Sequence, residues 1–183
     1  NTHRSNVKHI VVSCGALLLN MTGFMSVAAV LPALFDALSL RETQAGWLAG
    51  AMFVSYAVTV PILTAITDKF DARSVVVGAM ILTGLSGIGF ALYVEEYWSA
   101  LVFRLLAGIG FAGVHFPGLK MLADRLPPNL MVRGSGVYVS MFTLGGAGSF
   151  FLAGVVIAFQ PWPWVFAISG FCSLLGALLI MFQ

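Results

Sequence analysis

Residues 101–125 read LVFRLLAGIGFAGVHFPGLKMLADR, an apolar stretch long enough to cross a lipid bilayer that nevertheless contains Arg104 and His115. A positive charge near the centre of a membrane helix costs roughly 2.5–3.5 kcal/mol, so such a residue is expected to face protein or water and to serve a function. At about 100° per residue, His115 lies within about 40° of Arg104, whereas Gly110 and Gly113 lie on the opposite side. We therefore predict one polar lining face and one small-residue face that packs closely against a neighbouring helix.

The composition of the whole chain is that of a polytopic membrane protein. Of its 183 residues, 60% are hydrophobic and 9% are charged, which is more apolar surface than a water-soluble domain of this size can bury. Six apolar runs each reach the roughly 20 residues that a helix needs to cross a hydrocarbon core of about 30 Å. The predicted fold class is all-α, with residues 1–183 forming a single bundle of six transmembrane helices. The expected helices span residues 10–34, 44–66, 74–94, 97–123, 130–159 and 162–182.

Basic residues are distributed unevenly between the ends of these helices. Most of them fall in the N-terminal segment and in the second and fourth connections: Arg4, Lys8, Lys69, Arg73, Lys120, Arg125 and Arg133. The other connections contain only Arg41. Because Lys and Arg are retained on the cytoplasmic side of a membrane, both termini are predicted to be cytoplasmic. We expect an integral protein of a bacterial inner (cytoplasmic) membrane.

Polar side chains in three other runs are candidates for contact with a solute. Asn20 lies near the middle of the first run, Tyr56 in the second and Tyr138 in the fifth. Each has a structural alternative, because a mid-membrane Asn also donates hydrogen bonds between helices and a Tyr also packs in a seam. Tyr138 belongs to a small-residue stripe with Gly134 and Gly145, which either admits a facing helix or leaves room for a ligand.

The connection after the second run, residues 67–74 (TDKFDARS), is short and alternates in charge. A tight charged turn at the cytoplasmic surface can pair with its neighbours in only one conformational state, as a gate latch does. We therefore consider Asp68, Lys69 and Arg73 as latch residues. An ordinary solvated turn would have the same composition, since exposed ion pairs contribute little to stability.

The sequence GLSG at residues 84–87 resembles the motif around the serine of rhomboids, the intramembrane serine proteases. Such an enzyme needs a histidine base within hydrogen-bond reach of the serine, and His115 is the intramembrane histidine available. The other marks of that family, a Trp-Arg pair in the first loop and a histidine in the sixth helix, are absent. We interpret GLSG as a packing seam and expect no enzymatic activity. The sequence has no P-loop, Cys/His cluster or basic stripe, so we expect no cofactor, metal or nucleic-acid partner.

A short internal similarity suggests a repeat. The first run ends with residues 31–34 (LPAL), with Asp36 beyond them, and the fourth ends with residues 116–119 (FPGL), with Asp124 beyond them. Because these two helices run in opposite directions, the match predicts a 3+3 inverted repeat, which is a device of secondary transporters.

With these motifs, the whole chain resembles the amino-terminal six-helix half of a major facilitator superfamily transporter. The turn after the second run is similar to that family's motif G-x-x-x-D-R-x-G-R-R at Asp68, Lys69 and Arg73, but Thr64, Asp71 and Ala72 replace two glycines and a basic residue. The fourth run is similar to the motif R-x-x-x-G-x-G at Arg104, Gly108 and Gly110. The fifth run lacks the proline of the antiporter motif.

The resemblance implies an arrangement and several residue roles. Helices one, two, four and five would line a central cavity, with three and six outside them. Arg73 would pair with Asp124 at the end of helix four, and Asp68 would cap a helix of the other half when the inside is closed. Arg104 would have a structural or proton-coupling role, which competes with direct binding of an anionic substrate.

The functional hypothesis is a secondary active transporter, or its N-terminal half, that moves a small solute by alternating access. The cations Arg104 and His115 favour an anionic solute. No Asp or Glu lies inside the expected spans, so a proton carrier would be His115 or would belong to a second six-helix half. That partner half would be the missing part of the same chain, a homodimer mate or another subunit. The alternative is a half-transporter that no longer transports and acts as an accessory or scaffold subunit of a membrane complex.

Overall fold

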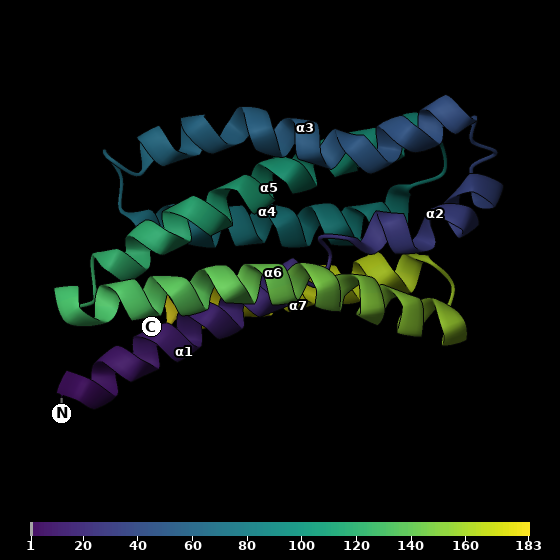
Figure 1. Ribbon diagram of the computed structural model, residues 1–183. Helices are drawn as coiled ribbons and strands as arrows, with labels where there is room; N and C mark the ends of the chain where they lie inside the picture. Colours follow the sequence, from purple (N-terminus) through teal and green to yellow (C-terminus); the bar gives the residue numbers. More distant parts are fainter. Residues whose placement is uncertain (1) are drawn as a thin grey trace.

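The computed structural model describes residues 2–183, with side chains from residue 7 onward, and within this range the chain is helical apart from its turns (Figure 1). Its helices are α1 Thr2–Met21, α2 Ser26–Ala37, α3 Glu42–Ile66, α4 Ala72–Tyr93, α5 Tyr97–Ala123, α6 Pro128–Phe159 and α7 Pro163–Met181. Six spans in the described chain are long and apolar enough to cross a membrane, the first of them made of α1 and α2 together. The prediction of an all-α protein with six spanning segments is confirmed.

The first span is interrupted, whereas residues 10–34 were expected to form one continuous helix. Thr22 Oγ1 donates to the carbonyl of Leu19 at 2.8 Å and Ser26 Oγ to that of Gly23 at 2.7 Å. Hydroxyls that bond nearby carbonyls compete with the helical hydrogen bonds, and a glycine between them weakens the helix further. The amide N–H of Met25 donates instead to Ser149 Oγ of α6 at 2.9 Å. The backbone of the interruption is thus satisfied by protein, as a membrane interior requires.

The helices form two layers, with α3, α5 and α6 in front and α4 and α7 behind them (Figure 1). α4 packs between α5 and α7, and α7 packs in turn against α1. The second span, α3, packs on the fourth, α5, much as the fifth span, α6, packs on the first, α1 and α2, so these contacts are preserved when the two sets of three spans are exchanged. Because the first and fourth spans cross in opposite directions, this pairing is that of an inverted 3+3 repeat.

Glycines let the back layer approach its neighbours closely. A Cβ atom added to Gly113 of α5 would lie 2.5 Å from Ala79 Cβ of α4, and one added to Gly110 would lie 2.9 Å from the Ala79 carbonyl oxygen. A Cβ at Gly84 of α4 would likewise lie 2.9 Å from the carbonyl oxygen of Gly170 in α7. These distances leave no room for a side chain, so the predicted small-residue face of residues 101–125 is the α4–α5 seam.

Substituting Gly84 by Val should therefore destabilise the bundle, because its methyl groups would push α4 away from α7. Overpacking of this kind costs about 1–3 kcal/mol, which we expect to find as a lower free energy of unfolding in detergent. Gly78→Val is the matched control on the same helix, since a Cβ there would meet open space. Equal stability of the two variants would contradict the close α4–α7 contact.

Candidate functional site

Arg104 lies inside the bundle, beside the interruption of the first span. Its side chain is only 4% exposed and its Nε atom has no hydrogen-bond partner among the described residues. It lines a cavity of about 20 Å³ together with Asn20 of α1, Ser86 of α4 and Ser169 of α7. A site needs about 10–15 Å³ to hold one water molecule. The space beside the guanidinium is therefore large enough for one water molecule or one ion of similar size.

Asn20 connects three helices at the same depth. Its side chain is fully buried, and its Oδ1 atom lies 2.6 Å from the Oγ of Ser173 in α7. Ser173 Oγ also lies 2.8 Å from the carbonyl oxygen of Met80 in α4, and its single proton can serve only one of these acceptors at a time. Asn20 thus takes the structural alternative, a hydrogen bond between helices. Its Nδ2 atom has no partner in the described part of the chain.

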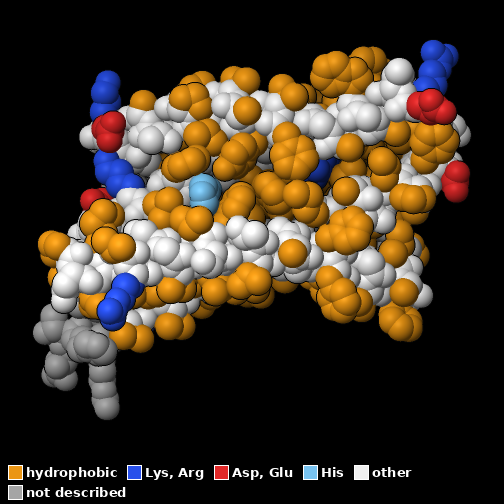
Figure 2. All heavy atoms as spheres, in the orientation of Figure 1, with side chains coloured by type: hydrophobic (Ala, Val, Ile, Leu, Met, Phe, Trp, Pro, Cys, Tyr) orange, Lys and Arg blue, Asp and Glu red, His pale blue; other side chains and the backbone are white. Residues whose placement is uncertain are grey.

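His115 lies in different surroundings, half-buried between α5 and α6. Its ring centroid is 4.2 Å from that of Phe142 and 6.4 Å from that of Tyr138, with which it stacks. The face that α3, α5 and α6 present in Figure 2 is covered with apolar side chains and has a histidine among them. His115 is therefore a half-buried residue of this apolar surrounding, and its Nδ1 atom has no hydrogen-bond partner among the described residues.

Arg104 and His115, which were expected together on one lining face, have different neighbours in the structure. The two residues do share a side of α5, but they are 11 positions apart (115 − 104), or about 16 Å along a helix axis. At the depth of Arg104 the neighbours are α1, α4 and α7, whereas at the depth of His115 the neighbour is α6. Because helices cross at an angle, one side of a helix meets different partners at different depths.

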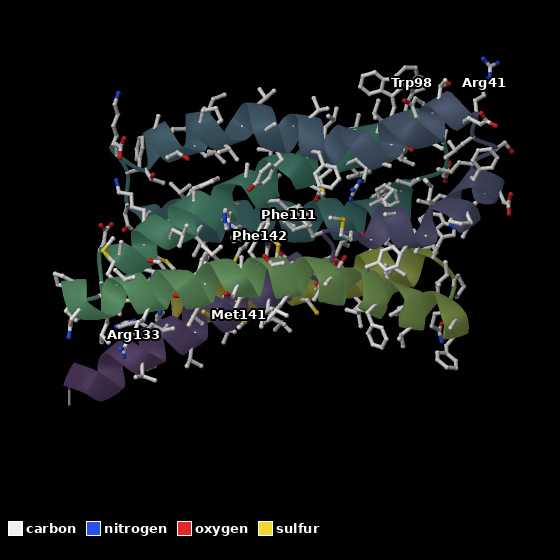
Figure 3. The ribbon with its side chains drawn as sticks, in the orientation of Figure 1. Arg41, Trp98, Phe111, Arg133, Met141 and Phe142 are labelled. Atoms are coloured by element: carbon white, nitrogen blue, oxygen red, sulfur yellow. The ribbon has the colours of Figure 1, made fainter. Side chains whose placement is uncertain are left out.

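An aromatic cluster that the sequence analysis missed contacts both of these environments, because Phe111 lines the Arg104 cavity and Phe142 packs on His115. Phe24, in the interruption of the first span, packs edge-on against Phe111 of α5, Phe142 of α6 and Phe53 of α3, with ring centroids 5.2, 5.4 and 5.6 Å apart. Figure 3 shows Phe111 and Phe142 in the space between α5 and α6. Phe111 also lines the Arg104 cavity. The only signal in the sequence was a phenylalanine beside glycine and threonine in mid-span.

The two tyrosine candidates lie differently. Tyr138 of α6 is buried, and its hydroxyl donates to the carbonyl of Val114 in α5 at 2.9 Å. It sits against Gly118, where an added Cβ would overlap the tyrosine ring. The small-residue stripe around Tyr138 thus admits a facing helix. Tyr56 of α3 is half-buried and packs against the core.

At the end of the bundle predicted to be cytoplasmic, the turn between α3 and α4 contacts α5. Lys120 Nζ donates to Asp68 Oδ1 at 2.9 Å and to the carbonyl of Thr67 at 2.7 Å. The side chains of Lys120 and Asp68 are 36% and 75% exposed, so this ion pair contributes about 1 kcal/mol or less to stability. Lys69 and Asp124 are exposed beside it.

The implied pairing of Arg73 with Asp124 is not formed in this structure. Arg73 Nε donates to the carbonyl of Ile180 at 3.1 Å, and its Nη2 donates to that of Met181. The last carbonyls of a helix lack partners within the helix and carry partial negative charge, so the end of α7 attracts a guanidinium. Asp124 instead lies just beyond the last residue of α5.

The GLSG segment serves packing. Ser86 is buried, and its hydroxyl donates to the carbonyl of Thr83 one turn earlier at 2.9 Å. A Cβ at Gly87 would lie 3.1 Å from the Cα of Gly170 in α7. A serine whose proton is bonded within its own helix, in a seam closed by a second helix, is not placed as a nucleophile. The protease alternative has no support.

Comparison with known proteins identifies the family. The sequence model described as Major Facilitator Superfamily matches residues 13–183. The chain belongs to the Major Facilitator Superfamily. It is 22% identical over 173 residues to an uncharacterized transporter of Buchnera aphidicola, a match that covers 91% of this chain and 41% of that protein. It is 26% identical over 155 residues to a probable 4-methylmuconolactone transporter of Cupriavidus pinatubonensis, covering 84% and 36% of the two chains.

The fold of this Major Facilitator Superfamily chain matches a solved structure over its whole length. The match is to the crystal structure of a bacterial homolog of the human lysosomal transporter Spinster in an inward-facing and occupied conformation, with a TM-score of 0.84 and 22% identity. It covers 100% of this chain and 44% of the other. The chain therefore spans less than half the length of these similar proteins, and the resemblance to an amino-terminal half found from its motifs is confirmed.

The hydrogen bond between Asn20 and Ser173 should be measurable as a coupling energy. Asn20→Ala and Ser173→Ala are each expected to lower the free energy of unfolding. The double variant should lose less than the sum of the two, with a coupling of about 0.6 kcal/mol and at most about 1.7 kcal/mol, the mean and the maximum found for hydrogen bonds between membrane helices. Strictly additive losses in a double-mutant cycle would show that the two side chains do not interact. Ser140→Ala is a control on the exposed side of α6.

Proposed function

We propose that this chain is the amino-terminal half of a secondary active transporter that moves a small anionic solute across a bacterial inner membrane by alternating access. The observation that carries the proposal is the interrupted first span beside a buried arginine. Secondary transporters build their sites from discontinuous helices near the bilayer midplane. A buried positive charge in a span is a functional feature by default. Membership of the Major Facilitator Superfamily and similarity to proteins named as transporters support the transport activity.

The face formed by α3, α5 and α6 is the proposed location of the solute. The Arg104 cavity has a volume of about 20 Å³, which excludes an organic molecule. His115, Phe142 and Tyr56 lie outside that cavity, where an apolar wall and a single ionisable group meet. Ligand sites combine a mainly apolar lining with a few polar groups in this way. The positive charge of His115, when it is protonated, favours an anion.

A second six-helix half completes the proposed site. The similar proteins are more than twice as long as the matched region, which supports a partner half in the complete transporter. Large apolar side chains of α3 remain exposed in the bundle, among them Phe53, Val54 and Val58, and are available to lipid or to that half. The distribution of Lys and Arg supports cytoplasmic termini. The accessory-subunit alternative has no support, because the similar proteins are named as transporters.

His115 is the proposed proton carrier of this half. An unperturbed histidine changes its charge between about pH 5 and pH 8, and the membrane interior of the chain offers no carboxylate for the task. His115→Asn in the complete protein should abolish most of the pH dependence of solute uptake into proteoliposomes across that range. His9→Asn is the matched control near the N-terminal end, and uptake by it should stay pH-dependent. Uptake that remains equally pH-dependent in His115→Asn would remove this histidine from the coupling mechanism.

Asp68 is the proposed gate residue on the cytoplasmic side. Asp68→Asn removes an exposed ion pair, so the free energy of unfolding should change by less than about 1 kcal/mol. If Asp68 also contacts the second half when the inside is closed, turnover should fall roughly threefold to tenfold, equivalent to about 0.7–1.4 kcal/mol, with solute affinity retained. Transport and binding assays on the same preparation separate the two effects. Asp36→Asn, exposed at the other end of the bundle, is the control. Unchanged turnover would exclude a gating role.

A further inference from the structure

The cavity beside Arg104 contains a charge without a counter-charge. The guanidinium is 4% exposed, and its Nε atom has no partner among the described residues. None of the residues that line the cavity is Asp or Glu. Burying a charge away from water is costly unless an opposite charge or several hydrogen bonds compensate it. The cavity therefore favours an occupant that is negatively charged.

Some of the polar groups that line the cavity have N–H groups free to donate hydrogen bonds to an anion, and others do not. Thr83, Ser86 and Ser169 each spend their single hydroxyl proton on a backbone carbonyl of their own helix, at 3.0, 2.9 and 3.0 Å. The donors left over are the N–H groups of Arg104 and the unpartnered Nδ2 of Asn20. Guanidinium and amide groups supply several donors each and are suited to binding an acceptor.

The size of the cavity limits the occupant to one small particle. Its volume of about 20 Å³ accommodates one water molecule, for which about 10–15 Å³ suffices. A chloride ion is a single atom that is somewhat larger than a water molecule, whereas carboxylates, phosphate and organic solutes consist of several heavy atoms and are larger still. Phe111, which packs against Phe24, is one of the residues that line the cavity.

We propose that this cavity binds a single halide ion, chloride in the cell, as the counter-ion of Arg104. The site is distinct from the proposed solute site and does not require that the protein transports an anion. Its lining residues come from α1, α4, α5, α7 and the interruption of the first span. A bound chloride would therefore join these elements and stabilise the packed bundle, because a ligand that binds only the folded state shifts the folding equilibrium toward it.

Thermal unfolding of the complete protein in detergent tests the proposal. Chloride is titrated against gluconate, a large organic anion of the same charge, so that the ionic strength stays constant while the halide concentration changes. The apparent Tm should rise saturably by a few degrees with chloride and with bromide and should not rise with gluconate. Bromide also allows direct detection, as an anomalous scattering peak beside Arg104 in crystals grown with that ion.

Two variants assign the effect to the cavity. Arg104→Met removes the charge and should abolish the halide-dependent rise in Tm. Should that variant fail to fold, Ala107→Val keeps Arg104 and fills the space with methyl groups, since Ala107 lines the cavity. The affinity for bromide should fall at least tenfold in Ala107→Val. Ala123→Val, at the far end of the same helix, is the matched control and should retain the full halide response.

The result that overturns the proposal is a Tm that does not depend on the halide in the wild-type protein. In that case a water molecule occupies the cavity, or the Asn20 amide turns its oxygen toward Arg104. A halide response that persists in both Arg104→Met and Ala107→Val would also overturn it, since the ion would then bind elsewhere. These outcomes are independent of uptake by the His115 variant, so the failure of either proposal can be recognised separately.

Discussion

A lipid bilayer offers no hydrogen-bond partners, and this constraint governs the few polar groups in the bundle. Where the first span is interrupted, the N–H of Met25 is satisfied by Ser149 of a distant helix. The Ser173 hydroxyl is at hydrogen-bond distance from Asn20 Oδ1, and the Tyr138 hydroxyl donates to the carbonyl of Val114. The bonds of Met25 and Asn20 join helices that are far apart in sequence, and the bond of Tyr138 joins the consecutive helices α5 and α6. Polar residues therefore specify which spans are neighbours, whereas apolar contact alone would leave several arrangements equally favourable.

Close backbone approach supplies the rest of the cohesion. Glycines at Gly84, Gly113 and Gly170 bring α4 within contact of both α5 and α7, so the back layer forms a tight slab. Dispersion attraction between such surfaces is small for each atom pair and large in sum. Because lipid tails solvate apolar side chains as well as protein does, this tight packing is what favours helix–helix contact over helix–lipid contact.

The fold was largely predictable from the sequence, because long apolar runs and the positions of the basic residues follow directly from the bilayer. The expected helices after the first begin and end within two residues of those observed. The interruption at Gly23 was not predicted, since Thr22 and Ser26 are equally common in continuous membrane helices, where their hydroxyls bond within the helix. The different surroundings of Arg104 and His115 were not predicted either. The two residues share a side of α5, but this does not show which helix packs against that side at each depth. Arg73 was assigned to Asp124 by resemblance, and the structure places it on the end of α7 instead.

Phe24 has a mechanical consequence for the bundle. Its ring is clasped by aromatic rings of α3, α5 and α6, while its backbone forms the weakest point of the first span. If the first span bent at Phe24, it would have to move α3, α5 and α6 with it or break these ring contacts. These contacts stiffen an interruption that would bend easily in an isolated helix. The six spans should therefore tilt together as one rigid unit, and large movements should occur between this unit and the neighbouring part of the transporter.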